Sequence, residues 1–294
     1  MAVNNIVIGP NSHRIQYDAG TVIADLIAGV ESAVLATHGW ELYDATAGTN
    51  AKCYRALNKD GVTYKYTVLD YNTSGKLIAK VYESWNSGTH VGTNLAYNSD
   101  AGSAAQLVNL VNGGNLYLFI NPRWLVLSSY VLGAIGTGTA NYLGPSGIVE
   151  FERIHPEDTG AAGYPCFQSL YSNGVSAPGY IPRTRGGLVS SANTLWGMGN
   201  PWGSALSYGL SPWSNLYQAC DSWAYASSYS QAGVGSDVRG RHFGLKLFPN
   251  NAGQYMDETT VNVNAEFFVD PNGTPTGFWV LVHGTSTNRI LLPK

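Results

Sequence analysis

The sequence predicts an α+β fold: an antiparallel β-meander covered by one main helix, followed by a loop-rich C-terminal β region rich in glycine and aromatic residues. Residues 62–68 alternate strictly between apolar and polar side chains, which is typical of a half-buried strand. The turn sequence Asn58-Lys59-Asp60-Gly61 precedes this run and is a strong hairpin signal. The chain from Trp40 to Trp85 is therefore expected to form the meander, with one face in contact with solvent.

The segment before the meander has the pattern of an amphipathic helix that could cover the other face. Its apolar residues recur every four positions, at Val22, Leu26, Val30 and Val34. Asp18 or Thr21 is expected to cap its start, and Gly39 suits its end. We expect the helix to cover the apolar side of strand 62–68, which carries Val62, Tyr64, Tyr66 and Val68. Thr63, Lys65 and Thr67 are expected on the opposite, solvent-facing side.

The sequence after the meander predicts one short helix and further strands. A short helix is expected over 104–111, a buried hairpin over 116–127, a loop over 133–147 and a strand over 148–154. Strands are also expected over 243–248, 260–269, 278–283 and 289–292. We expect a helix-on-sheet domain over 1–159. Residues 160–294 form either a loop-rich β region of their own or an elaboration of the same domain.

The composition excludes several classes of protein. Only 12% of the 294 residues are charged, where about 25% is usual for soluble domains, and the net charge is −3. Nothing here favours binding to nucleic acid or to an anionic membrane. Because 44% of residues are hydrophobic, the chain is not disordered, so the low charge indicates either an extracellular protein or a surface covered by neighbours in an assembly.

The N-terminus leads us to expect synthesis in the cytoplasm, a reducing compartment in which cysteines remain thiols. The first residues lack a basic and apolar signal peptide. The most apolar window, 116–132, contains Asn121, Pro122 and Arg123, so no membrane insertion is expected. The three cysteines have no metal-ligand spacing. We predict free thiols at Cys53, Cys166 and Cys220.

One dense cluster of ionisable residues could carry chemistry. It comprises Glu150, Glu152, Arg153, His155, Glu157 and Asp158. It could hold a carboxylate pair for glycan hydrolysis or a metal site, but neighbouring strand residues point apart, which favours a structural role. No GxSxG, HExxH, Walker or Rossmann motif is present. We therefore predict no catalytic residue, no metal, no cofactor and no enzymatic activity.

The segment 186–236 contains a single charged residue, Asp221, and is rich in aromatics that fit no helical or strand period. Aromatic residues on Gly/Ser-rich loops form adaptable contact surfaces, although a loop-rich core or a sugar-binding site would use the same residues. The predicted interface residues are Trp196, Trp202, Tyr208, Trp213, Tyr217, Trp223 and Tyr225.

Several stretches together resemble structural proteins of tailed-bacteriophage virions. They are CYRALNKDGVTYKYTVLDY and KVYESWNSGTHVGTN in the meander, then LYLFINPRWLVLSS and GIVEFERIHPEDTGAAGYPCF, and finally GRHFGLKLFPNNAGQYMD and NRILLPK. The resemblance implies a non-enzymatic virion component of the tail, baseplate, neck or head decoration, tail or baseplate being favoured. Its partners would be other copies of itself and other virion proteins. The alternatives are a module that binds a host-surface glycan or receptor and, third, a glycan or cell-wall hydrolase.

Overall fold

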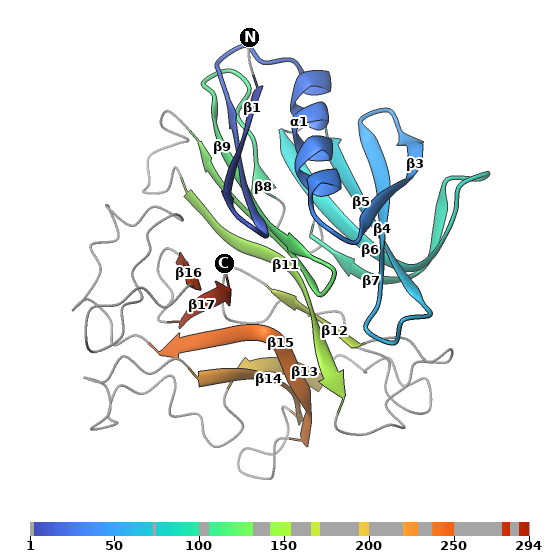
Figure 1. The fold of residues 1–294 in the computed structure, drawn as a ribbon, viewed down its shortest axis with the longest axis vertical. Coiled ribbons are helices and arrows are strands. Elements are labelled where there is room, and N and C mark those ends of the chain that lie inside the picture. The colour runs from blue at the N-terminus through green and yellow to red at the C-terminus, as the bar shows by residue number, and fades with distance from the viewer. Residues whose placement is uncertain are drawn as a thin grey trace. The chain divides into compact units, whose positions relative to one another are not determined.

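The computed structural model describes residues 3–72, 75–99, 106–131, 142–153, 166–170, 194–199, 220–228, 237–249, 278–282 and 288–293 (Figure 1). The chain divides into two compact units, Met1–Ile148 with Ser169–Tyr171 and Val149–Gln168 with Ser172–Lys294. The described elements are antiparallel strands and one helix, which confirms the α+β class and the β-meander. The proposed division at residue 159 stays a prediction.

The first sheet of the first unit has the order β1 (Val3–Gly9), β2 (Ser12–Tyr17), β9 (Gly114–Asn121) and β10 (Trp124–Val131), followed by β11 (Tyr142–Arg153). β9 and β10 are the predicted buried hairpin. The Asn121 side chain accepts hydrogen bonds from the backbone N–H groups of Arg123 (2.6 Å) and Trp124 (3.1 Å), which closes the turn. The loop predicted over 133–147 is wrong from residue 142 onward, because β11 begins there.

The second sheet is the predicted meander. Its order is β3 (Trp40–Gly48), β4 (Ala51–Leu57), β5 (Tyr64–Asn72), β6 (Lys76–Asn86) and β7 (Val91–Asn98), and the short strand β8 (Gln106–Leu107) also pairs with β6. The helix predicted over 104–111 is wrong in its described part. Gln106 and Leu107 pair with β6, and the Val108 N–H bonds the Gly75 carbonyl at 2.8 Å, so these residues gain their hydrogen bonds from the sheet and its turn.

The helix α1 (Ile23–Ala36) lies between the two sheets (Figure 1). Leu26, Val30 and Val34 of the predicted four-residue repeat are buried, together with Ala33, but Val22, the first member of the repeat, precedes the helix and is 57% exposed. Gly29 faces the first sheet, where a Cβ atom would lie 2.5 Å from Val3 Cγ1, so glycine permits the close approach of helix and strand. Toward the second sheet, Glu31 forms an ion pair with Lys52 of β4.

The predicted N-terminal cap of α1 is wrong, and Gly39, predicted at the other end, lies two residues beyond the C-cap Thr37 with a left-handed φ of 89°. The N-cap residue is Val22, with no side-chain cap, because Asp18 and Thr21 form a separate turn through the Thr21 N–H and the Asp18 carbonyl (3.1 Å). At the other end the Thr37 hydroxyl donates to the Ala33 carbonyl at 3.1 Å. Packing between two sheets therefore fixes where this helix begins, in place of a polar cap.

The face of the meander that is covered is the opposite of the predicted one. Lys65 and Thr67 of β5 are 1% and 0% exposed. On the predicted side, Val68 is buried, but Tyr64 and Tyr66 are only partly buried and Val62 is 77% exposed. The Lys65 ammonium donates to the Pro122 carbonyl in the β9–β10 turn and to Asn58 Oδ1 at 3.2 Å. These hydrogen bonds compensate the ammonium group for the loss of its water on burial. The side of β5 that carries Lys65 can therefore face the core.

The second unit holds β13 (Thr194–Gly199), β14 (Cys220–Ser228), β15 (Asp237–Pro249), β16 (Phe278–Val282) and β17 (Asn288–Pro293), and β12 (Cys166–Leu170) pairs with β11. β15 pairs with β14, β17 and the end of β11, and all these pairs are antiparallel. Three predicted C-terminal strands are confirmed within β15, β16 and β17; the strand predicted over 260–269 lies outside the described residues.

A first test concerns the buried lysine. We expect Lys65→Met to destabilise the protein by about 2 to 4 kcal/mol, because the Pro122 carbonyl and Asn58 Oδ1 lose their donor in the interior. Urea unfolding followed by circular dichroism measures this difference. Lys59→Met, at an exposed turn position, should change stability by less than about 0.5 kcal/mol. Equal effects of the two changes would contradict the role assigned to Lys65.

Candidate functional site

The interface residues predicted from the sequence lie only partly within the described chain. Trp202, Tyr208, Trp213 and Tyr217 fall outside it. Trp196 lies in β13 opposite Ala226 of β14, while Trp223 and Tyr225 of β14 lie opposite Gly199 and Gly197. The expectation that this segment has no regular structure is wrong for these two strands, whose hydrogen bonds come from each other and from β15. The interface role of these residues stays a prediction.

The ionisable cluster is also partly described. Glu150 is buried in β11 and Glu152 is exposed, whereas His155, Glu157 and Asp158 lie outside the described residues. Glu152 and Arg153 lie opposite Arg241 and Gly240 of β15. The structural role predicted for this cluster stays a prediction.

The uncovered side of the meander carries a group of aromatic side chains, which we call the aromatic face: Tyr43 (β3), Tyr64 and Tyr66 (β5), and Tyr82 and Trp85 (β6). All five are partly exposed. All except Tyr64 pack on the buried residues Ala51, Cys53 and Val68. The Tyr43 and Tyr66 rings meet edge to face at 5.1 Å, and the Tyr82 and Trp85 rings lie 5.4 Å apart. Sequence reasoning found Tyr64 and Tyr66 through their alternation but assigned them to the covered side, and it did not single out the other three.

Arg55 of β4 is held at one end of the aromatic face. Its guanidinium carbon lies 4.6 Å from the ring centres of both Tyr43 and Tyr64, and its Nε atom pairs with Glu41. Burial lowers the pKa of Arg55, but the hydrogen bond and charge of Glu41 outweigh burial and raise it. The positive charge is therefore both fixed in place and compensated.

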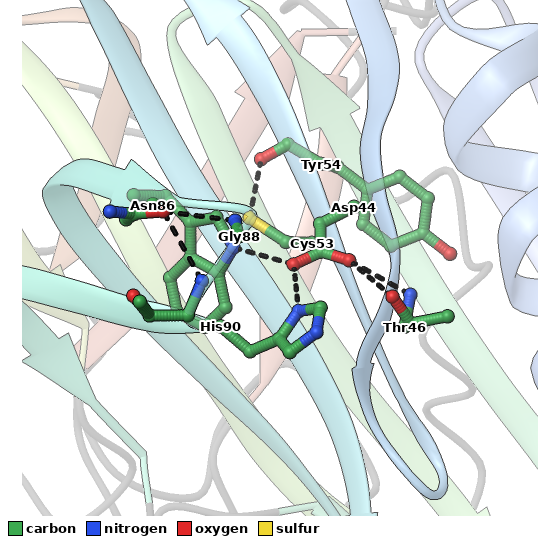
Figure 2. A network of polar contacts seen from close by, with 9 residues as sticks. Asp44, Thr46, Cys53, Tyr54, Asn86, Gly88 and His90 are labelled. Carbon is green, nitrogen blue, oxygen red and sulfur yellow. Dashed lines mark hydrogen bonds and ion pairs between the residues drawn. The ribbon is translucent and has the colours of Figure 1, made fainter.

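At the other end, the carboxylate of Asp44 joins β3 to β6 and to the β6–β7 turn (Figure 2). Oδ2 accepts hydrogen bonds from Trp85 Nε1 and from His90 Nδ1, both at 2.8 Å. Oδ1 accepts bonds from the Thr46 N–H (2.9 Å) and the Thr46 hydroxyl (3.1 Å). Four donors converge on a carboxylate that is 3% exposed.

These donors determine the charge state of Asp44. Burial by itself would raise the pKa of its carboxyl, but the hydrogen bonds from His90, Trp85 and Thr46 outweigh burial and lower the pKa to about 2. Asp44 is thus ionised at neutral pH. His90 remains 42% exposed and adopts a left-handed backbone conformation (φ 55°) at the end of the turn.

Cys53 lies buried beneath the aromatic face and is a free thiol, as predicted for this residue. Burial, and then the negative charge of Asp44, raise the pKa of the thiol to about 12. The thiol is therefore protonated at neutral pH and is a poor nucleophile. Cys166 and Cys220 lie in β12 and β14, and their free state stays a prediction.

The charges around the aromatic face are arranged in pairs. Arg55 pairs with Glu41, His90 bonds Asp44, and Lys80 lies 3.6 Å from Asp70. Within the described part of the chain, no three His, Cys, Asp or Glu side chains are grouped so as to hold a metal ion. The arrangement can supply aromatic contact surface, an exposed imidazole and compensated charges, all suited to binding.

No protein family model matches the chain, and no curated protein matches it. Among the described residues no helix is long and apolar enough to cross a membrane; α1 has 14 residues, where about 20 are needed.

A second test concerns the packing of the aromatic face. A Cβ atom on Gly92 of β7 would lie 2.3 Å from Tyr82 Cδ1, so we expect Gly92→Ala to displace the ring and destabilise the protein by about 1 to 3 kcal/mol. Thermal or urea unfolding measures the loss. In a Tyr82→Ala background the same change should be nearly neutral, and an equal cost in both backgrounds would show that Tyr82 is not the cause.

A third test concerns Asp44 and acid. Its folded-state pKa of about 2 lies below the ordinary value of 3.8, so its contribution is present above about pH 4 and is lost as the pH falls through about 2. That contribution should be about 2 kcal/mol at neutral pH. Asp44→Asn should lack it, so the stability difference between wild type and variant, measured by urea unfolding, should shrink between pH 4 and pH 2. The exposed Asp25→Asn is the matched control; a difference for Asp44→Asn that is independent of pH would contradict this account.

Proposed function

We propose that this protein is a structural component of a tailed-bacteriophage virion, in the tail or baseplate, that acts by self-assembly and by docking to other virion proteins. The low charged fraction and the resemblance of its segments support this proposal. The observation that carries it is the character of strand β1 at the outside of the first sheet.

Strand β1 has the features of an edge that is completed by another chain. Among the described strands it pairs only with β2. Its seven residues, VNNIVIG, include no charged residue and no proline, and Val7 is 66% exposed. Its pairing with β2 has one irregularity, near its end between Val7 and Gly9. Long, uncharged edge strands readily pair with a further strand, and soluble proteins usually protect them.

The outer strand β3 of the second sheet provides a contrast within the same unit. β3 carries the exposed Glu41 and the buried Asp44, and its pairing with β4 shifts register twice. Charges, inward-pointing carboxylates and irregular pairing are the usual protections of an edge. β1 lacks these charges, which supports strand pairing between subunits as the route of assembly.

A fourth test uses a charge at this edge. Val7→Lys should weaken self-association of the purified chain at least about tenfold, because a lysine at an edge opposes pairing with another strand. Light scattering across a concentration series measures the association. Val62→Lys is a matched control, since Val62 is 77% exposed in a turn and should leave association unchanged.

A wild-type chain that is monomeric throughout, or association that Val7→Lys leaves intact, would contradict assembly through β1. Localisation of the chain in purified phage particles by cryo-electron microscopy tests the virion assignment itself. Binding of the isolated chain to host cells, unaffected by Val7→Lys, would favour the receptor-binding alternative.

A further inference from the structure

We propose that the end of the aromatic face formed by Tyr82, Trp85 and His90 binds a neutral glycan, with a sugar ring stacked on the indole of Trp85. This site involves the second sheet and is independent of assembly through β1. Its ligand class follows from three properties of the face: fixed ring orientation, an available imidazole and the absence of uncompensated charge on the groups described above.

The two rings are held rigidly before any ligand arrives. The Trp85 indole N–H donates to the buried Asp44 carboxylate at 2.8 Å, which fixes one edge of the indole. The Tyr82 ring lies 5.4 Å away at an interplanar angle of 57°, over Gly92. The two rings thus present aromatic surfaces at an angle, supported from below by Cys53 and Val68. Preorganised rings bind with little loss of conformational entropy.

His90 adds a directed polar group beside these rings. Its Nδ1 atom lies 2.8 Å from Asp44 Oδ2, so this nitrogen carries the proton and donates it to the carboxylate. Nε2 is then left for a ligand on a side chain that is 42% exposed. Nε2 accepts a hydrogen bond in the neutral imidazole and donates one in the imidazolium, and a sugar hydroxyl is suited to both.

The charges exclude strongly ionic ligands. Arg55 is paired with Glu41, Lys80 lies 3.6 Å from Asp70, and Asp44 is occupied by its four donors. A nucleic acid requires several uncompensated cationic groups for its phosphates. The paired charges here favour a neutral ligand.

The size of the surface favours a glycan over a protein. A fully exposed aromatic side chain offers roughly 150 to 250 Å2, but each ring of the aromatic face is already partly buried. The remaining aromatic area is therefore well below the roughly 800 Å2 per partner of a standard protein interface. One or two sugar rings, each with an apolar C–H face and a rim of hydroxyls, match a small aromatic surface with few polar groups.

The test is a titration of the full chain with three neutral probes: maltohexaose, cellohexaose and the hexamer of N-acetylglucosamine. We expect at least one probe to bind in the millimolar range or tighter by calorimetry, and to shift the Trp85 indole N–H resonance, which is assigned by its loss in Trp85→Phe. Trp85→Ala should weaken this binding about tenfold or more, and His90→Ala about three- to tenfold. His38→Ala, an exposed histidine outside the face, is the matched control and should bind as wild type.

Three results would overturn the proposal. One is that no probe binds and the Trp85 resonance does not move. Another is that binding persists in a folded Trp85→Ala variant, with circular dichroism reporting the fold. The last is that Trp85→Ala changes self-association without any sugar binding in the wild type, which would make the face a protein contact. The indole resonance keeps the test valid if Trp85→Ala does not fold, and none of these results depends on the Val7→Lys experiment.

Discussion

The ammonium group of Lys65 lies in the interior of the first unit, where the Pro122 carbonyl and Asn58 Oδ1 accept its protons. It also lies 5.8 Å from the centre of the Trp40 ring, so a cation–π contact accompanies these bonds. Because successive strand residues point to opposite faces, burial of Lys65 turns its neighbours Tyr64 and Tyr66 to the other side. The aromatic face depends on this single orientation, since the same strand with Lys65 outward would turn both tyrosines to the core side.

Helix α1 makes that orientation stable by packing against both sheets at once. On one side Gly29 lets it approach Val3 and Ile15, and on the other Glu31 pairs with Lys52. A helix in this position buries its apolar residues Leu26, Val30 and Val34 between the two sheets. The edges then differ in their own residues: β3 carries charge and irregular pairing, whereas β1 carries neither Lys, Arg, Asp nor Glu. Under the proposal of assembly through β1, these unequal edges would let a subunit join others in a defined direction.

Asp44 has a corresponding role on the uncovered face. A carboxylate that is 3% exposed would be costly without partners, and its four hydrogen bonds come from Thr46 on its own strand and from Trp85 and His90 on β6 and the following turn. One buried charge thereby fixes the positions of Trp85 and His90, and burial together with this charge raises the pKa of the nearby Cys53 thiol. Under the glycan proposal, the fold itself therefore orients the groups that would contact the sugar, with a protonated thiol beneath them.

The sequence by itself determined the elements that rest on local pattern. The four-residue repeat of Leu26, Val30 and Val34 and the turns at Asp60-Gly61 and Asn121-Pro122 specify a helix and hairpins through backbone geometry that neighbouring residues dictate. Only the tertiary structure decided which face of β5 is buried, because that depends on a carbonyl 57 residues away that satisfies Lys65. The same is true of the Asp44 site, whose donors Trp85 and His90 lie 41 and 46 residues along the chain. It is also true of the start of α1, where the N-cap residue is Val22 and no side chain caps the helix. Local pattern sets which conformation a segment adopts, whereas long-range hydrogen bonds determine which side chains meet, and no periodicity in the sequence reports them.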